Sequence, residues 1–353
     1  MDAPSLEIAD GFDALRRLAG PAPRDADGAD FFCTLGWFET LARDGFTDEA
    51  PCPLAVLRPP APAAPVCVPL RGGTALTGLA NYYTSLYAPV GDPAGVPDTL
   101  WAALAHRLQQ LPGHRGEVVL QPLEADGPFL ARLQPALGAA GYWTDRFFCF
   151  GNWYLTVAGR SFAQYFATLP AALRHTIERG RRKLTRTAPW RIEIQQAADA
   201  RLEAATDAFE TVYRASWKPA EPQPRFIPAL VRLAAERGWL RLGVLYLAEE
   251  PIAAQLWLVK DGKASIYKLA YVERHARLSA GSVLTAALMA HVLDQDRVAE
   301  VDYLTGDDDY KRDWMSHRRE RVGLVAFHAR SWRGLLGAAR HFAGKRLRQW
   351  KLN

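Results

Sequence analysis

The sequence predicts an α/β protein of two domains, each built on a mixed, mostly antiparallel sheet flanked by helices. The chain of 353 residues is long enough for about two domains. Residues 240–272 contain three apolar runs separated by short turns, a pattern typical of adjacent antiparallel strands. Helical spacing of apolar residues recurs in both halves of the chain. The order of these segments lacks the regular strand–helix alternation of a doubly wound parallel sheet.

The composition excludes several classes of protein. With 49% hydrophobic and 23% charged residues, the chain is unlike disordered, collagen-like or disulfide-scaffold sequences. Cys33, Cys52, Cys67 and Cys149 lack metal-binding or redox spacing and are expected to be reduced thiols of a cytoplasmic protein. The first ten residues lack the basic flank of a signal peptide. The longest apolar stretch, 283–293, is far shorter than the roughly 20 residues that span a bilayer.

Residues 1–150 are expected to form the first domain. Segments with helical spacing of apolar residues alternate there with short apolar runs bounded by proline and glycine. The predicted helices are 34–41, 100–111 and 129–140, and the predicted extended segments are 54–57, 66–70, 79–87 and 117–121.

Residues 151–330 are expected to form the second domain. Ser161 is placed to cap one helix, and Pro170 opens a second, very basic one. Asp261-Gly262 marks a hairpin turn. The predicted strands are 152–157, 190–195, 240–247, 252–260, 264–272, 300–304 and 323–328, and the predicted helices are 162–169, 171–187, 202–217, 226–237 and 281–294, with a helical turn at 310–315.

The net charge of +5 is unevenly distributed along the chain. Residues 1–150 hold 10 Lys and Arg against 17 Asp and Glu, whereas residues 151–353 hold 33 against 21. This excess of positive charge favours a polyanionic partner for the second part: a phosphorylated cofactor, RNA or a lipid surface. A solvated basic face is the alternative.

The order of elements in residues 151–330 resembles the layout of GNAT acyltransferases. In that layout, the helix after the strand 264–272 begins at a small-residue loop, where free N–H groups and the helix dipole bind a pyrophosphate. Ala280, Gly281 and Ser282 allow such a close approach, and Arg277 can add a charge-assisted hydrogen bond. Plain capping of the helix is the alternative.

Two motifs narrow the resemblance further. Residues 271–284, YVERHARLSAGSVL, and residues 301–311, VDYLTGDDDYK, resemble the CelD-like acyltransferases of cellulose biosynthesis, which are related to Fem-type aminoacyltransferases. The Gly-Asp and Tyr-Lys pairs match that family, which has proline where this chain has Ala280. The basic helix and residues 79–83 also resemble it. The resemblance covers residues 30–330 and implies two tandem GNAT-like domains, of which the second binds the donor.

The resemblance also implies an acyl-CoA, such as acetyl-CoA, as co-substrate, and no metal. The implied cofactor-binding residues are Arg277, Ser279, Ala280, Gly281, Ser282, Val283 and Tyr267. GNAT enzymes typically carry Arg/Gln-x-x-Gly-x-Gly/Ala in this loop. If Arg277 holds the first position, Ala280 and Ser282 replace the two glycines. Backbone N–H groups could still bind phosphate, but the departure also suits a protein that has kept the fold and lost the reaction.

Acyl transfer to an amine needs a base for the amine proton and an acid for the leaving group. Tyr310 is the candidate acid, because GNAT enzymes often place a tyrosine near the leaving thiolate. Asp302, Asp309 and His275 are the candidate bases. Four aspartates lie within eight positions, and such crowding is expected to raise at least one pKa. Packing of the tyrosine and capping by the aspartates are the alternatives.

The remaining candidates would bind substrate: Asp307, Lys311, Lys268, Arg174 and Trp217. A carboxylate suits a substrate amine, and a lysine suits a phosphate or a carboxylate. Arg174 belongs to the basic helix, whose arginines suit either the 3′-phosphate of coenzyme A or a tRNA acceptor stem. No helical-hairpin insertion of the kind found in tRNA-using Fem enzymes is visible, so nucleic acid is not predicted as a partner.

Residues 331–353 are expected to form a basic amphipathic helix. The segment contains no acidic residue, and its apolar residues share one stripe from Trp332 to Trp350. This pattern predicts peripheral contact with an anionic membrane. Docking of the stripe onto the domain is the alternative.

Together these features predict an acyl-CoA-dependent N-acyltransferase. The amine would belong to a saccharide or an amino-acid-derived acceptor and would attack directly in a ternary complex. Two alternatives stay open. One is Fem-type aminoacyl transfer from charged tRNA, and the other is a non-catalytic GNAT-like accessory protein in exopolysaccharide biosynthesis.

Overall fold

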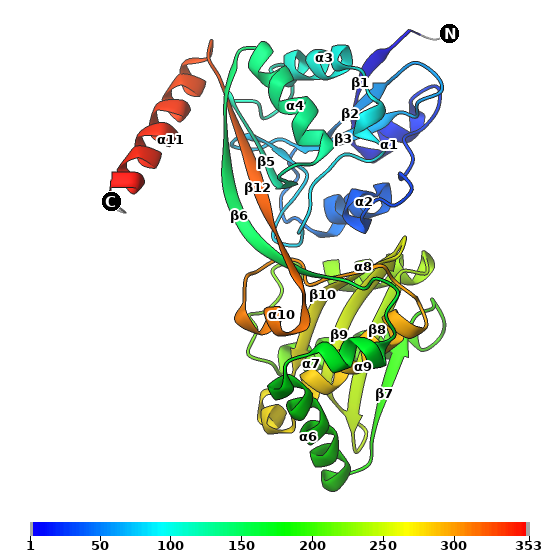
Figure 1. Cartoon of the computed structure of the whole chain (residues 1–353). Helices are drawn as coiled ribbons and strands as arrows, with labels where there is room; N and C mark the ends of the chain where they lie inside the picture. Colours follow the sequence, from blue (N-terminus) through cyan, green and yellow to red (C-terminus); the bar gives the residue numbers. More distant parts are fainter. Residues whose placement is uncertain (1–2, 351–353) are drawn as a thin grey trace. The chain divides into compact units, whose positions relative to one another are not determined.

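The computed structural model describes residues 3–350, with side chains through residue 346. The chain divides into two compact units (Figure 1): Met1–Phe150 with Glu320–Asn353, and Gly151–Arg319. The predicted α/β class is confirmed in both. The sequence-based division put residues 151–330 in one domain and 331–353 in a segment of their own. Instead, the chain re-enters the first unit at Glu320, because the following strand pairs there with an earlier one.

The first unit holds a sheet in the order β1-β2-β3-β4-β5-β12-β6. Neighbouring strands pair antiparallel from β1 to β4 and between β5 and β12, whereas β4 and β5 are parallel. The strands are β1 (Ser5–Asp10), β2 (Pro53–Arg58), β3 (Val66–Arg71), β4 (Leu76–Gly78), β5 (Glu117–Glu124), β6 (Tyr142–Thr156) and β12 (His317–His328), and the α-helices are α1 (Gly11–Arg17), α2 (Leu35–Asp44), α3 (Asp98–Leu108), α4 (Pro128–Ala139) and α11 (Trp332–Trp350).

The extended segment predicted at 79–87 is wrong. Asn81 forms a turn there, because its side-chain oxygen accepts a hydrogen bond from the Tyr83 backbone N–H at 3.0 Å. Tyr83 and Tyr87 are buried without forming a strand, whereas Tyr82 is 65% exposed, and the Tyr87 hydroxyl donates to the Pro69 carbonyl at 2.6 Å. The sequence also failed to predict β1 and α1, which begin the unit.

The second unit holds a sheet in the order β6-β11-β10-β9-β8-β7. All its neighbouring strands pair antiparallel except β10 and β11, which are parallel. The further strands are β7 (Trp190–Gln195), β8 (Leu240–Leu247), β9 (Glu250–Lys260), β10 (Lys263–Tyr271) and β11 (Glu300–Asp302), and the α-helices are α5 (Phe162–Thr168), α6 (Ala171–Thr187), α7 (Leu202–Arg214), α8 (Phe226–Glu236), α9 (Ala280–Asp294) and α10 (Asp309–Trp314).

The predicted elements of the second unit are confirmed, and α6 and β7 have the predicted bounds. Ser161 caps α5 in a full capping box with Gln164. The predicted strands 152–157 and 323–328 are the ends of much longer ones, because β6 and β12 each continue from one unit into the other. No helix in residues 3–350 is long and apolar enough to cross a membrane.

Helix α9 is the centre of the second unit's core. It is apolar on most sides, as expected of a buried helix, and Val283, Leu284 and Leu288 are fully buried. Gly243 of β8 lets it approach closely, since a Cβ there would lie 2.9 Å from Leu288. Gln255 of β9 donates to the Gly281 carbonyl at 3.1 Å. The first turn of α9 is thereby fixed against the sheet.

Candidate functional site

The N-terminus of α9 has the geometry of an anion site. Ser279 precedes the helix with a left-handed φ of 55°, and its side chain makes no capping hydrogen bond. The first backbone N–H groups of an α-helix have no acceptor within the helix. Those of Ala280, Gly281 and Ser282 therefore remain available, and the helix dipole adds partial positive charge beside them.

The basic helix α6 lies against this N-terminus. Gly180 permits the contact, because a Cβ there would lie 3.0 Å from the Leu278 carbonyl oxygen and 2.9 Å from Val283. Lys183 donates to the Arg277 carbonyl at 2.7 Å. Two exposed cations, Lys183 and Arg277, therefore flank the helix start.

The strand before this loop has an open edge. β10 and β11 pair only at residues 263–265, and β10 then continues to Tyr271 beyond the end of β11. A bulge interrupts its pairing with β9 between Ile266 and Lys268, which leaves Tyr267 as the extra residue. β11 thus covers this edge of β10 only as far as residue 265, and an extended ligand can approach the edge beyond it.

Three lysines gather beside this strand: Lys218 in the loop after α7, Lys268 on β10 and Lys311 on α10. Lys268 is 9% exposed and forms an ion pair with Glu221 at 2.8 Å. The Lys218 and Lys268 ammonium groups lie 5.8 Å and 5.9 Å from the centre of the Tyr213 ring. Lys311 is 5% exposed and donates to the Thr305 carbonyl, with Asp308 at 3.3 Å.

Lys218 has the most altered environment of the three. Burial, with the positive charges of Lys268 and Lys311 nearby, lowers its pKa to about 8. Within residues 3–346, its ammonium group makes no hydrogen bond or ion pair, only cation–π contacts with Tyr213 and Trp217. Part of the Lys218 population is therefore a neutral amine near pH 7, which can accept a proton.

An aromatic pair connects the lysines with the start of α9. The ring of Trp217 packs on that of Tyr271, with centroids 4.4 Å apart. Tyr271 in turn contacts the helix start, because a Cβ on Gly281 would lie 3.3 Å from its ring. Trp217, predicted to bind substrate, is 49% exposed. Because Trp217 precedes Lys218 in the chain, the aromatic pair lies next to the group of three lysines.

Tyr310 lies on α10 next to Lys311. Its ring meets the buried ring of Tyr303 edge-on, with centroids 5.7 Å apart. Partial burial and the charge of Asp308 raise the pKa of Tyr310 to about 12. The hydroxyl therefore keeps its proton at neutral pH, as an acid must, and 46% of the residue is exposed to a ligand.

Asp302 is not placed to act as a base. Its side chain is fully buried and accepts hydrogen bonds from Asn152 at 2.6 Å and from the Leu304 backbone N–H at 2.7 Å. Burial alone would raise its pKa, but the cations of Lys263, at 2.8 Å, and Arg319 hold that pKa well below its usual range. The expected raised pKa is thus wrong for Asp302.

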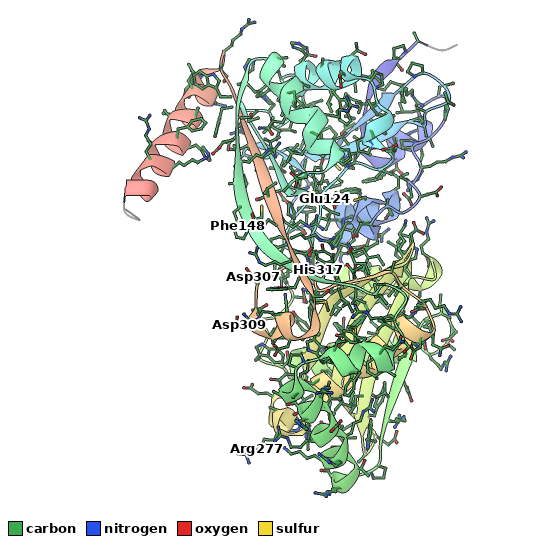
Figure 2. The ribbon with its side chains drawn as sticks, viewed as in Figure 1. Glu124, Phe148, Arg277, Asp307, Asp309 and His317 are labelled. Carbon is green, nitrogen blue, oxygen red and sulfur yellow. The ribbon has the colours of Figure 1, made fainter. Side chains whose placement is uncertain are left out.

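The other two acidic candidates, Asp307 and Asp309, have different surroundings. Asp307 accepts hydrogen bonds from Trp153 at 2.7 Å and from Arg318, and the bond from Arg318 lowers its pKa. Asp309 is exposed at the start of α10. Both are labelled in Figure 2, far in that view from Arg277. Crowding along the sequence therefore does not raise the pKa of Asp307.

Two further candidates are placed differently from the prediction. Val283 is fully buried in the core, and its backbone N–H already donates to the Ser279 carbonyl at 3.1 Å, so it has no group to offer a phosphate. His275 precedes α9 but lies beside Glu250, with 3.6 Å between the ring and the carboxylate.

Arg174 remains a candidate, because its Nε atom is buried with no hydrogen-bond partner. The sequence missed Glu221 and assigned no chemistry to Lys218. Both lie in a proline-containing loop that has no motif of its own. Only the fold brings this loop beside β10.

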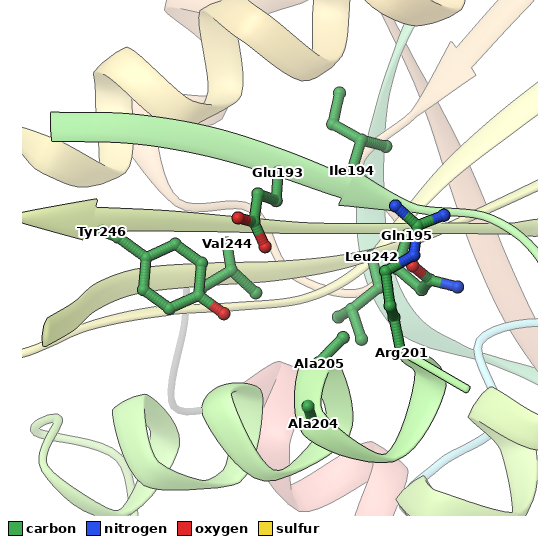
Figure 3. Close-up of a pocket in the computed structure, with 9 residues that line it drawn as sticks. All are labelled: Glu193, Ile194, Gln195, Arg201, Ala204, Ala205, Leu242, Val244 and Tyr246. Atoms are coloured by element: carbon green, nitrogen blue, oxygen red, sulfur yellow. The ribbon is translucent and has the colours of Figure 1, made fainter. Parts of the chain in front are cut away.

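The structure contains a separate pocket of about 260 Å³ between β7, β8 and α7 (Figure 3). Glu193 and Arg201 line it, but each is already paired, with Arg191 at 2.8 Å and with Asp199 at 2.9 Å. It contains none of the predicted site residues. Among the residues that the structure describes, no group of three or more His, Cys, Asp or Glu could hold a metal ion.

Comparison with known families identifies the second unit. Residues 171–312 match the family described as the acetyltransferase (GNAT) domain. This segment is therefore similar to GNAT acetyltransferase domains. It includes the start of α9, the open edge of β10 and all three lysines, so the candidate site lies inside the GNAT domain. The predicted assignment to the GNAT superfamily and to the acyltransferases is confirmed, whereas the CelD-like branch stays a prediction.

Solved structures extend the likeness over most of the chain. FemX matches 86% of this chain and 93% of its own, with 11% identity and a TM-score of 0.55. A conserved protein of unknown function from Bacteroides thetaiotaomicron VPI-5482 matches 86% and 94%, with 10% identity and a TM-score of 0.54. The C-terminal domain of a putative lysylphosphatidylglycerol synthetase from Agrobacterium fabrum matches 77% and 83%, with 13% identity and a TM-score of 0.50.

At these identities the likeness shows the fold alone. It extends over parts of both units. No curated protein matches the chain. Evidence for the reaction therefore comes from the residues of the segment 171–312.

Proposed function

We propose that this protein transfers an acyl group from an acyl-CoA to an amine, which attacks the thioester directly in a ternary complex. One observation carries the proposal: the uncapped N-terminus of α9 adjoins the open edge of β10. An anion-binding helix start beside a strand edge that β11 does not cover suits a donor that has a diphosphate and an extended, amide-containing arm.

The residues present fit such a donor. The N–H groups of Ala280, Gly281 and Ser282 would bind the diphosphate, with Arg277 and Lys183 as flanking cations. The bulge at Tyr267 would face the arm near the acyl group. The replacement of two family glycines by Ala280 and Ser282 does not prevent this, since the bonds come from the backbone.

Lys218 is the base that we propose for the acceptor amine. Its lowered pKa, and the absence of an ion-pair partner among the described side chains, leave it able to take a proton near neutral pH. This role replaces the one predicted for Asp302. Asp309 and His275 stay as predicted candidates, and Tyr310 would return a proton to the leaving thiolate.

The three lysines also suggest a class of acceptor. Lys268 forms an ion pair with Glu221 and Lys311 one with Asp308, whereas Lys218 forms none within residues 3–346. An acceptor that brings its own negative group would balance the remaining positive charge. We therefore propose an amine on an amino-acid-derived or anionic saccharide acceptor, with Lys311, Lys268, Trp217 and Arg174 as contacts.

Aminoacyl transfer from charged tRNA is the second candidate. The exposed arginines of α6 favour it, since Arg179, Arg182 and Arg186 present a basic surface that suits a polyanion. A gel-shift assay with charged tRNA separates the two candidates. A non-catalytic accessory role, such as in exopolysaccharide biosynthesis, would be supported if neither donor bound.

We further propose that the protein works in the cytoplasm and contacts the inner membrane surface through residues 331–353, of which 351–353 lie outside the described residues. An acceptor made near that surface would then be within reach of the enzyme.

The donor site is tested by changing the second residue of α9. We expect Gly281→Asp to raise the Kd for acetyl-CoA at least 100-fold, because a carboxylate there repels the diphosphate. Gly281→Asn is the matched control: it brings the same bulk near the Tyr271 ring without the charge, and its Kd should change less than tenfold. Isothermal titration calorimetry measures both.

Binding that is equally weak in both variants would mean that bulk rather than charge matters, and the proposed diphosphate position would then be wrong. If acetyl-CoA and a long-chain acyl-CoA both fail to bind the unmodified protein, charged tRNA becomes the preferred donor.

Tyr310→Phe tests the proposed acid. We expect kcat to fall about tenfold, less than the usual 10²–10⁴ for general acid catalysis, because a thiolate is already a good leaving group. The Kd for the donor should stay within about twofold, since the lost hydroxyl lies away from the helix start. Steady-state kinetics with titration calorimetry measure both quantities, and an unchanged kcat would remove the acid role.

A further inference from the structure

Helix α11, shown in red in Figure 1, follows β12 and contacts the first unit through its small residues. Gly334 and Ala338 are buried, and a Cβ on Gly334 would lie 2.3 Å from the His328 carbonyl oxygen. A Cβ on Gly337 would lie 2.9 Å from the Phe327 ring. The glycines thus let the helix lie directly on the end of β12.

Two side chains further along α11, His341 and Lys345, bind Asp145 and form a charged clamp on the same face of the helix. His341 and Lys345 both contact Asp145 of β6, at 2.8 Å and 2.7 Å. Residues 334, 338, 341 and 345 recur at intervals of three or four and so lie on one side of the helix. The docked face is therefore defined over three turns.

Three large apolar residues of α11 lie away from the docked face. Trp332 is 68% exposed, and Leu335 and Leu336 are each 43% exposed. These three residues form the outward stripe, whereas the Phe342 ring packs edge-on against Phe327 of β12, with centroids 6.4 Å apart. An amphipathic helix that docks on its own domain normally buries its bulky residues and exposes its small ones. Here the arrangement is reversed, which indicates a surface that is covered by something else.

The charge of the helix limits what can cover it. Arg333, Arg340 and Arg346 are exposed, and residues 329–353 contain no acidic residue. A second copy of the chain would bring the same positive charge to the contact and be repelled. An anionic bilayer instead accepts the arginines at its headgroups and the apolar side chains below them.

We propose that the outward stripe of α11 lies in the interface of an anionic membrane, with Trp332, Leu335 and Leu336 inserted and Arg333 and Arg340 on headgroups. The clamp on Asp145 keeps the helix docked while the stripe inserts. This assignment deepens the location proposed above and does not depend on the reaction, so binding can be present or absent whatever the activity.

Co-sedimentation with vesicles tests the assignment on the full chain. We expect binding to vesicles of phosphatidylglycerol and phosphatidylcholine, at least tenfold weaker binding to phosphatidylcholine alone, and loss of binding in high salt. The triple variant Trp332→Ser, Leu335→Ser, Leu336→Ser should bind at least tenfold more weakly. Trp143→Ser with Phe148→Ser is the matched control, because these residues of β6 are also large and exposed.

The arginines are tested separately by Arg333→Glu with Arg340→Glu, which should weaken binding at least tenfold. Arg179→Glu with Arg182→Glu, on the exposed face of α6, is the control and should bind as the unmodified chain does. The thermal midpoint should be unchanged throughout, because all these side chains face away from the core.

Three results would overturn the assignment. One is failure of the unmodified chain to bind anionic vesicles. Another is vesicle binding that is unchanged in the triple variant, or that the α6 control variant weakens as much as the α11 arginine variant does. The third is a dimer in light scattering that the triple variant converts to monomer, which would give the outward stripe to a second copy of the chain.

Discussion

Replacing Lys218 with arginine is expected to lower kcat by about 10²–10⁴-fold, the usual range for loss of a general base. Arginine keeps the positive charge and most of the length, but it does not release its proton at any pH at which the protein is folded. Lys218→Gln removes both the charge and the base, so comparing the two variants separates the roles. If Lys218→Arg retains activity, the charge suffices and the base is another group.

The dependence on pH provides a second measurement for the same residue. A base works when it is deprotonated, so kcat/KM should rise as the pH increases through about 8, the pKa to which burial and the neighbouring lysines lower Lys218. An acceptor amine of low pKa, such as hydroxylamine, keeps the acceptor's own titration out of this range. The rise should vanish in both variants, and a rise that persists would assign the titration to a different group.

Neither variant should unfold the protein. The lowered pKa means that burying the charged Lys218 ammonium group reduces the free energy of unfolding. A neutral glutamine at this position removes that destabilisation. The free energy of unfolding of Lys218→Gln is therefore expected to equal or exceed that of the unmodified protein near pH 7. A drop in activity can then be attributed to chemistry.

The sequence predicted the second unit better than the first because local signals there agree with the fold. α6 begins after Pro170, and α5 begins at a Ser161 capping box, so both are specified within a few residues. The aromatic run at 79–87 follows no such rule: its extended pattern gives way to the Asx turn at Asn81 and to burial of Tyr87. Tertiary packing decided that segment.

The candidate site likewise has one part that local sequence predicts and one part that depends on tertiary packing. The start of α9 could be predicted, since a helix start follows from local residues. The lysine group could not, because Lys218, Lys268 and Lys311 lie far apart in sequence and meet only when the loop after α7 packs on β10. Crowding of aspartates along the chain was misleading for the same reason. Each pKa follows from neighbours in space, and for Asp302 these are cations.

Asp302→Asn is expected to lower the free energy of unfolding by about 3–5 kcal/mol, the usual cost of removing one partner of a buried ion pair. Lys263 and Arg319 would keep their charges next to a neutral amide. Asp307→Asn, in the loop after β11, is the matched control. Its ion pair with Arg318 is 45% exposed on the aspartate side, so its loss should change the free energy of unfolding far less than Asp302→Asn does. Denaturant unfolding at pH 7 measures both.

The sign of the pH effect makes this prediction specific to the charge. The pKa of Asp302 is lower in the folded than in the unfolded chain, so its stabilisation is complete above the unfolded value of about 4 and is lost as the pH falls toward the folded value. The gap between the unmodified protein and Asp302→Asn should therefore be constant from pH 7 to 5 and shrink below pH 4. A gap that stays constant in acid would mean that packing or hydrogen bonding, rather than the charge, holds the turn at Leu304 that leads to Tyr310 and Lys311.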